Sequence, residues 1–433
     1  MQSDELQLQV DWSQSSQDEE NFTSWPINNE TKLIKNGNFN KEKSNQIVDD
    51  IIKNKVFHVV ITGGEPMIVM EELYPYLQKL LDNNIEVTIN SNLSYFPDKI
   101  CNNLISMGIN SLLVSVPASN KELDFKITNC YTAFDNTIIG IKRAIKAGFN
   151  ISTNMVVSKL NYHDIFNTGK LVKSLGIRSF SMTRAVQPSN CKDFEKYKLS
   201  ISEFCTLPEK LKEVKDKLGL NVFSVEAYPL CFIDDFELIK ETGFDRLCTA
   251  GKTFCAIDPN GAIRPCILLS DSVNLDLRNA WDSFDEYRED TNLPDECKGC
   301  KFEYTCGGGC KAERKHSCGC FKVLDPFANL KNKYEYDETQ PDIKVTSTIE
   351  DCFKVNSHLK FREEDFGGIF YLANNNFIAV DNNLYTFIKN NNIFSASKFI
   401  KENKYSEIDG LKTIEFLKSK RMIILEKNDK KRI

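Results

Sequence analysis

The chain has 433 residues, of which 41% are hydrophobic, 11% aromatic and 27% charged, a composition that excludes collagenous, coiled-coil and wholly disordered proteins. At about 150 residues per domain, this length predicts two or three domains. The net charge of -6, from 55 basic and 61 acidic residues, gives no overall attraction to nucleic acid or to anionic lipid. No apolar run approaches the ~18 residues of a membrane helix, and residues 1–20 lack the basic and apolar regions of a signal peptide. We therefore expect a cytoplasmic protein with neither nucleic-acid nor membrane partners.

The first half of the chain alternates helical and strand patterns. Residues 1–30 are polar, apart from a short apolar alternation at residues 6–10 that predicts one strand. From residue 41 to about residue 226, helix-period stretches alternate with short β-branched runs. The expected strands are 57–62, 85–90, 111–116, 151–157 and 177–182, and the expected helices are 42–54, 69–83, 96–107, 134–148 and 161–175. This order predicts an α/β fold, with a parallel sheet and crossover helices.

Residues 231–329 lose this periodicity and hold ten of the fifteen cysteines. Because cytosolic reductants keep thiols reduced, this concentration predicts metal or cluster ligation rather than disulfides. Bound inorganic groups would supply stability that the hydrophobic residues of this segment do not supply alone. Residues 330–343, rich in Lys, Asp, Glu and Tyr, are expected to be a linker.

The last module, residues 344–433, is expected to be a small α+β domain. Its predicted strands are 359–363, 368–372 and 377–380, its predicted helices are about 382–389, 395–403 and 407–419, and an apolar segment, 422–425, ends it.

Many of the cysteines are spaced as ligands. Thiolates two or three residues apart can bind one metal centre, and more distant cysteines can complete its coordination. Spacing alone leaves zinc and iron–sulfur clusters as alternatives, while four thiols within fourteen residues disfavour simple buried thiols. The spaced residues are Cys248, Cys255 and Cys266, then Cys297-x2-Cys300-x5-Cys306-x3-Cys310, then Cys318 and Cys320. The cysteines without a partner at ligand spacing, expected to be small buried hydrophobic residues, are Cys101, Cys130, Cys191, Cys205, Cys231 and Cys352.

This array resembles the SPASM domain of radical S-adenosylmethionine (SAM) enzymes. In that pattern a cysteine is followed after nine to fifteen residues by Gly-x4-Cys, and here twelve residues separate Cys248 from Gly261. The resemblance implies two auxiliary 4Fe–4S clusters. It assigns the first cluster to Cys248, Cys255, Cys266 and Cys310, and the second to Cys297, Cys300, Cys306 and a closing cysteine. The family often closes with a cysteine after an Asp-Pro pair, but here Phe327 and Ala328 follow Asp325-Pro326, so we expect Cys320, or alternatively Cys318, to close the second cluster.

A Gly-Gly-Glu-Pro sequence, Gly63, Gly64, Glu65 and Pro66, directly follows the predicted strand 57–62. Two glycines let a backbone approach a ligand closely, and a carboxylate can hold an ammonium group. The sequence resembles the SAM-binding loop of the radical SAM core, which implies a partial (β/α) barrel and SAM as a cofactor. Ser91, Asn92 and Ser115 also stand where the family has cofactor-lining residues, although each is equally well explained as a turn former at a strand end.

The motif that defines an active radical SAM enzyme, Cys-x3-Cys-x2-Cys, is missing. No cysteine precedes Cys101, and Ser16, Glu20 and Thr23 stand at the three ligand positions. Hydroxyls and carboxylates are poor substitutes for thiolates on an iron–sulfur cluster. The sequence therefore predicts no catalytic residues and no radical chemistry by the family mechanism. Natural loss is favoured over alteration of the expressed protein or a misplaced reading start.

The last module carries an Arg-x2-Asp-Phe-Gly sequence, residues 362–367, inside its strand region. It resembles the PqqD-like peptide-recognition element, in which a leader peptide adds as a strand at a sheet edge. The alternative is a generic winged-helix-like domain, and a DNA-binding role would need a basic recognition helix. The lysines near the last helix and in the tail are interpreted as a solvated surface.

Together these features predict a radical SAM/SPASM-family protein that takes part in maturing a ribosomally synthesised peptide. We expect a non-catalytic or accessory subunit that binds the precursor peptide, carries two auxiliary 4Fe–4S clusters and pairs with an active maturase. The alternatives are an active radical SAM maturase that forms a crosslink, thioether or epimer, and a zinc-stabilised binding protein. The expected divisions are a polar segment, 1–30; the barrel, 31–230; the SPASM domain, 231–329; the linker, 330–343; and the peptide-recognition domain, 344–433.

Overall fold

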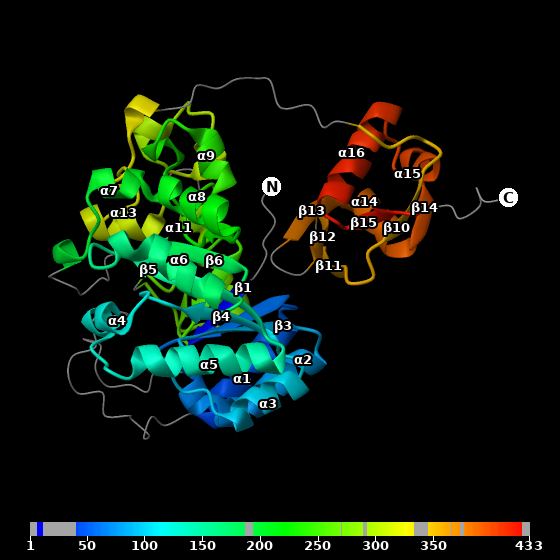
Figure 1. The fold of residues 1–433 in the computed structure, drawn as a ribbon. Coiled ribbons are helices and arrows are strands. Elements are labelled where there is room, and N and C mark those ends of the chain that lie inside the picture. Colours follow the sequence, from blue (N-terminus) through cyan, green and yellow to red (C-terminus); the bar gives the residue numbers. More distant parts are fainter. Residues whose placement is uncertain are drawn as a thin grey trace. The chain divides into compact units, whose positions relative to one another are not determined.

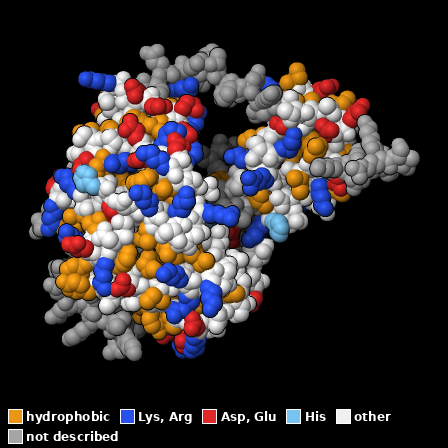
Figure 2. Space-filling model, viewed as in Figure 1, with side chains coloured by type: hydrophobic (Ala, Val, Ile, Leu, Met, Phe, Trp, Pro, Cys, Tyr) orange, Lys and Arg blue, Asp and Glu red, His pale blue; other side chains and the backbone are white. Residues whose placement is uncertain are grey.

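The computed structural model describes residues 7–11, 40–186, 194–269, 271–288, 292–332, 345–364, 366–372 and 376–426, with the side chains of residues 7–11, 304, 305 and 318 left aside. The chain divides into two compact units, Leu6–Tyr336 and Asp337–Ile433. This division falls inside residues 330–343, the segment that the sequence suggests as a linker. On the face shown in Figure 2, basic and acidic side chains are interspersed across both units.

The first unit is built on a nine-stranded sheet whose order is β7-β6-β5-β4-β3-β2-β1-β8-β9. All neighbouring strands are parallel except β8 and β9, which pair antiparallel. The strands are β1 (Gln7–Asp11), β2 (His58–Thr62), β3 (Glu86–Ser91), β4 (Ser111–Ser115), β5 (Asn150–Val157), β6 (Ser179–Arg184), β7 (Asn221–Ser224), β8 (Phe254–Ile257) and β9 (Ile263–Arg264). The predicted α/β fold with a parallel sheet is confirmed.

Amphipathic helices cover this sheet (Figure 1). In α2, the buried residues Met70, Leu73, Leu77 and Leu80 recur every three or four positions, so one face of the helix packs on the core. Helix α1 packs on α2 and α3 on α5, while α6 and α8 pack together against β5 and β7. The helices are α1 (Lys41–Lys53), α2 (Met70–Asp82), α3 (Asp98–Ser106), α4 (Lys121–Thr128), α5 (Ala133–Ala147), α6 (Ile165–Ser174), α7 (Ile201–Cys205) and α8 (Leu207–Leu218).

The cysteine-rich segment continues the first unit. Strand β8 pairs with β1, and one hydrophobic core runs from the sheet into Leu277, Trp281 and Phe284 of this segment. The apolar residues of this segment thus pack in a core shared with the sheet, and the stability expected from bound inorganic groups stays a prediction. Its helices are short: α9 (Phe236–Glu241), α10 (Leu277–Asp282), α11 (Asp285–Arg288), α12 (Glu303–Cys306) and α13 (Lys311–Cys318).

The second unit has a separate core and two three-stranded sheets, with orders β11-β12-β13 and β14-β10-β15. Phe370 of β12 and Tyr385 of α14 stack in its centre. Its elements are β10 (Cys352–Val355), β11 (Lys360–Glu364), β12 (Gly367–Leu372), β13 (Asn376–Asp381), α14 (Asn382–Asn390), β14 (Ile393–Ser395), α15 (Ala396–Glu402), α16 (Glu407–Ser419) and β15 (Ile423–Leu425). The three predicted helices and the three strands before them are present. Strands β10 and β14 were not predicted.

Candidate functional site

The carboxyl ends of strands β1 to β4 meet at one edge of the sheet. Asp11 pairs with Thr62, Ile61 with Ile89, and Ser91 with Val114, so these parallel strands end in step. Gly63–Pro66 follow β2, Ser91 and Asn92 end β3, and Ser115 ends β4. The fold therefore brings all seven of the residues that the sequence suggests for cofactor binding to a single edge, where parallel α/β sheets bind ligands.

Glu65 ties the loops after β2 and β3 together. One of its carboxylate oxygens accepts hydrogen bonds from Ser91 Oγ at 2.6 Å and from Met67 N at 3.1 Å, and the other accepts one from Asn92 N at 2.9 Å. Burial raises the pKa of Glu65, and these three hydrogen bonds work in the opposite direction. The carboxylate thus acts within the protein as a positioning group for both loops.

Gly63 supplies the backbone conformation that this loop requires. Its φ of 132° is in a region that side chains rarely adopt, so only glycine fits without strain. Pro66 begins the short 3-10 helix η1 (Pro66–Val69), for which Glu65 is the N-cap. The Gly-Gly-Glu-Pro sequence is therefore a rigid strand-to-helix turn at the sheet edge.

Ser16, Glu20 and Thr23 lie outside the described residues. The last described residue before them is Asp11, at the end of β1. Asp11 pairs with Thr62, which directly precedes the Gly63–Pro66 turn. The carboxyl end of β1 therefore lies at the same edge of the sheet as the predicted SAM loop.

The first group of cysteines comprises Cys248, Cys266 and Cys310. The Cys248 thiol is near enough for its charge to raise the pKa of both Cys266 and Cys310, although burial is the larger cause for each. Cys255, the fourth ligand that the sequence suggests, is fully buried in β8, where burial raises its pKa and Arg288 and Asp50 are the charged groups that act on it. The structure thus gathers three of the four predicted ligands of the first cluster.

Two buried cations from α13 face this group. Lys311 and Arg314 lower the pKa of Cys248 against the effect of its burial, and burial lowers the pKa of Arg314 against the charges of Cys297 and Cys310, which raise it. Arg314 is 0% exposed, and among the described residues its Nε and Nη2 atoms have no hydrogen-bond partner. A buried guanidinium with unmet donors fits a neighbouring anionic group, and a cluster held by four thiolates is anionic.

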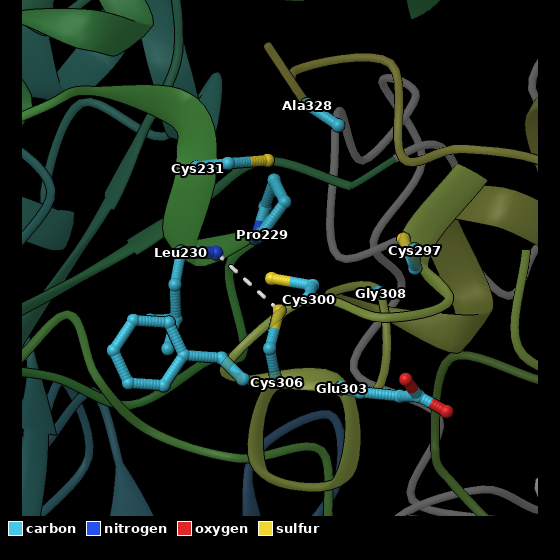
Figure 3. Close-up of a pocket in the computed structure, with 10 residues that line it drawn as sticks. Pro229, Leu230, Cys231, Cys297, Cys300, Glu303, Cys306, Gly308 and Ala328 are labelled. Carbon is cyan, nitrogen blue, oxygen red and sulfur yellow. Dashed lines mark hydrogen bonds between the residues drawn. The ribbon is translucent and has the colours of Figure 1, made fainter. Parts of the chain in front are cut away.

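A second group of cysteines lines one pocket. Cys297, Cys300 and Cys306, which the sequence suggests as ligands of the second cluster, share it with Cys231, and Figure 3 shows the four side chains around it. Cys306 Sγ accepts a hydrogen bond from Leu230 N at 3.4 Å. Burial, with added repulsion from neighbouring thiols, raises the pKa of Cys231 to about 11 and that of Cys297 to about 12. These thiols are therefore protonated at neutral pH and would release protons on binding metal.

The structure corrects the interpretation of two isolated cysteines. Cys231 is not simply a small buried residue, since it faces three other thiols. Cys130 is exposed rather than buried. Cys101 is buried as expected, Cys205 and Cys352 are half-buried, and Cys191 lies outside the described residues. Cys320 is exposed, and the side chain of Cys318 is not among those described.

Both groups consist of thiols, which in their deprotonated form are the usual ligands of iron–sulfur clusters and common ligands of structural zinc. Within the described residues, no three His, Cys, Asp or Glu side chains already have the geometry to hold a single metal ion. The thiol groups and the unmet donors of Arg314 fit a cluster, and when bound such a cluster supplies one-electron transfer.

The sequence analysis did not identify a network of buried charged side chains that contacts Cys310 of the first cysteine group. Arg184, at the end of β6, donates to both oxygens of Asp325, at 2.8 and 3.2 Å, and lies 3.7 Å from Glu226. Cys310 N also donates to Asp325, at 3.3 Å. Burial raises the pKa of Glu226 to about 8, although Arg184 lowers it. Asp325, which the sequence marked only as half of an Asp-Pro pair, therefore anchors the Cys310 backbone to the sheet.

Residues 28–172 match the family model described as "Radical SAM superfamily". This part of the chain is therefore similar to the radical SAM superfamily. It holds the Gly63–Pro66 turn, Ser91, Asn92 and Ser115, while the two cysteine groups lie beyond it.

Curated and solved proteins extend this similarity to most of the chain. An "AdoMet-dependent heme synthase" of Methanosarcina barkeri is 21% identical over 314 residues, covering 69% of this chain and 89% of that protein. Streptococcus suis SuiB, solved with bound S-adenosylmethionine, superposes with a TM-score of 0.57 and 19% identity, covering 76% of this chain and 78% of SuiB. The enzyme anSMEcpe, solved with bound AdoMet, gives a TM-score of 0.57 and 14% identity, covering 74% and 93%. At these identities the solved structures establish only that this chain shares their fold.

No helix of the described residues has both the length and the apolar content that a membrane span would need.

Proposed function

We propose that this protein is an accessory subunit in the maturation of a ribosomally synthesised peptide, and that it carries iron–sulfur clusters without generating a radical. The proposal rests on a contrast, within the first unit, between the cysteines that are present and those that are missing. Two groups of thiols follow the radical SAM domain, but the chain has no cysteine before Cys101 to hold the cluster that cleaves SAM.

The auxiliary clusters are assigned to residues 231–329 as a SPASM domain. Cys248, Cys266 and Cys310, with Cys255, would hold the first cluster, and Cys297, Cys300 and Cys306 would hold the second. Lys311 and Arg314 would offset the negative charge of both clusters. The hydrogen bond from Leu230 N to Cys306 Sγ is of the kind that stabilises a cluster thiolate.

A peptide partner is favoured by the second unit. Strand β13 pairs with β12 and, among the described residues, with no second strand, so it is an outer strand to which an extended peptide could add. A PqqD-like role for residues 344–433 rests on this edge and on the Arg-x2-Asp-Phe-Gly sequence. One of the similar solved structures, SuiB, is itself bound to a precursor peptide, SuiA. The partner that would perform the radical step is an active maturase.

Anaerobic purification followed by assay of iron, acid-labile sulfide, zinc and 5'-deoxyadenosine tests the proposal. We expect about eight irons with matching sulfide, which is two 4Fe–4S clusters, and no 5'-deoxyadenosine from SAM and dithionite. About twelve irons together with 5'-deoxyadenosine would instead identify an active maturase. Zinc without sulfide would identify a zinc-stabilised binding protein.

Peptide binding is tested separately with fluorescently labelled synthetic peptides from short reading frames beside the gene. Hydrogen exchange should show added protection in an outer strand, β11 or β13, when a peptide binds. Protection confined to α16 would argue against strand addition.

A further inference from the structure

We propose that Cys231 is the fourth ligand of the second iron–sulfur cluster, together with Cys297, Cys300 and Cys306. This assignment rests on the proposed function and refines it, because the sequence pattern has no clear closing cysteine. It places one ligand before the cysteine-rich array rather than at its end.

The four thiols converge on one pocket from two parts of the chain. Cys231 comes from the 3-10 helix η4 (Leu230–Phe232), and the other three come from residues 297–306. In Figure 3, η4 lies on one side of the pocket, and Cys300 and Cys306 lie on the other. Pro229, Leu230 and Phe302 contribute apolar surface to the lining, and among the described residues Glu303 is its one charged residue. Four thiols around an apolar pocket are the donor set of a 4Fe–4S cluster.

The backbone holds Cys231 in this position. The residues on either side, Leu230 and Phe232, are only 4% and 1% exposed, and Phe232 packs in the core against Phe204 and Phe244. Leu230 N donates to Cys306 Sγ, and Cys306 Sγ is 3.9 Å from the Tyr228 carbonyl oxygen. The same short segment that carries Cys231 is therefore already joined to an expected ligand of the cluster.

The competing cysteines are less well placed. Cys320 is exposed after the end of α13 and does not line the pocket. Cys310, which follows Cys306 closely in sequence, faces Cys248 in the first group instead. Cys318, whose side chain is not described, is the remaining alternative, and the experiment below includes it.

The test compares metal content and spectra of the full-length protein and single variants, all purified anaerobically. Cys231→Ala, Cys318→Ala and Cys320→Ala are the test variants. Cys205→Ala is the matched control, because Cys205 is half-buried and its thiol donates to the Phe232 carbonyl but does not line the pocket. Iron, sulfide and the low-temperature EPR spectrum of the reduced protein are measured for each.

We expect Cys231→Ala to fall from about eight irons to between about four and seven, with loss or conversion of one 4Fe–4S signal, because one iron of the cluster would lose its protein ligand and become labile. Cys318→Ala, Cys320→Ala and Cys205→Ala should keep the iron and the spectrum of the unaltered protein. An unchanged Cys231→Ala, with loss of one cluster in Cys318→Ala or Cys320→Ala, overturns the assignment.

Anaerobic alkylation of the unaltered protein gives a second readout that does not depend on a variant folding. With mass spectrometry as the detector, Cys231 should resist iodoacetamide until the iron is chelated, whereas Cys320 should react before and after chelation. Early alkylation of Cys231 in protein that holds about eight irons overturns the assignment while the proposed function stands. Unaltered protein without iron and sulfide overturns both.

Discussion

At the scale of single residues, the most consequential group is Arg184. Its guanidinium is buried with Asp325 and Glu226, and the Asp325 carboxylate also holds the Cys310 backbone. A buried ion pair adds little net stability compared with apolar packing, but removing one partner leaves an uncompensated charge. Arg184 is therefore required to keep β6 and the first cysteine group together.

Replacing Arg184 with Met should lower the free energy of unfolding by about 3–5 kcal/mol, since Asp325 would be left buried and unpaired. Urea unfolding of the purified protein measures this change. Arg178→Met, at an exposed position six residues earlier, is the matched control and should change stability by less than about 0.5 kcal/mol. Equal effects of the two substitutions would show that the ion pair does not stabilise this region.

Asp124 gives the protein a pH-dependent stability. Burial in α4 raises its pKa from 3.8 to about 6, with the Thr128 hydroxyl hydrogen bond opposing the shift. Because the folded-state pKa lies above the unfolded value, the protonated Asp124 carboxyl contributes to the free energy of unfolding. This contribution is fully present below pH 3.8 and is lost as the pH rises through 6. Asp124→Asn, which stays neutral, should therefore be more stable than the unaltered protein by about 1–2 kcal/mol at pH 8 and nearly equal to it at pH 4. Urea titrations from pH 4 to 8 measure the difference, and a difference that does not vary with pH would contradict this origin.

At the scale of elements, the Gly63–Pro66 turn links the ends of β2 and β3 through the Glu65 side chain. Glu65 accepts hydrogen bonds from Ser91, Asn92 and Met67, so the loops after β2 and β3 are positioned together before any ligand binds. Preorganised loops reduce the free-energy cost of binding, because less conformational freedom is lost.

Glu65→Ala should remove these three hydrogen bonds and destabilise the protein by about 1–3 kcal/mol, because the donors would be left in a buried site. Hydrogen exchange should be faster at the Met67 and Asn92 amides, while the exchange rates of helix α6, which packs elsewhere against the sheet, should not change. Glu71→Ala, at an exposed position on α2, is the control and should leave both amides protected. Unaltered exchange at Asn92 in Glu65→Ala would refute the linking role.

At the scale of the whole molecule, the described residues form two units with separate cores. The core of the first unit includes both sheet residues and cysteine-segment residues, among them Cys255 and Cys310. The core of the second unit is built from its own strands and helices. Metal loss should therefore affect one unit alone.

Removing the clusters by anaerobic chelation should reduce hydrogen-exchange protection in α13 and in residues 292–303 by at least about tenfold, because cluster binding is coupled to folding of that segment. Strand β12 and helix α16, in the second unit, should keep their protection. Equal loss of protection in both units would mean that they do not fold independently.

Much of the fold follows from the sequence because its patterns are local. The runs before Gly63 and Asn92 formed strands β2 and β3 within one residue of their expected limits, since apolar periodicity depends only on near neighbours. The Gly63–Pro66 turn was equally predictable, because glycine and proline restrict the backbone directly. Spacing also identified Cys297, Cys300 and Cys306 as one group, because short loops keep their thiols close together.

Only the tertiary structure decided which distant residues meet. It put β8 beside β1, joined Arg184 to Asp325, and brought Cys231 to the pocket of Cys297 and Cys306. No local pattern records such contacts, because they depend on how helices and strands pack across the core. The sequence by itself therefore determined most of the elements, the turn and the presence of closely spaced cysteines, whereas the packing of the first unit determined how those cysteines are grouped.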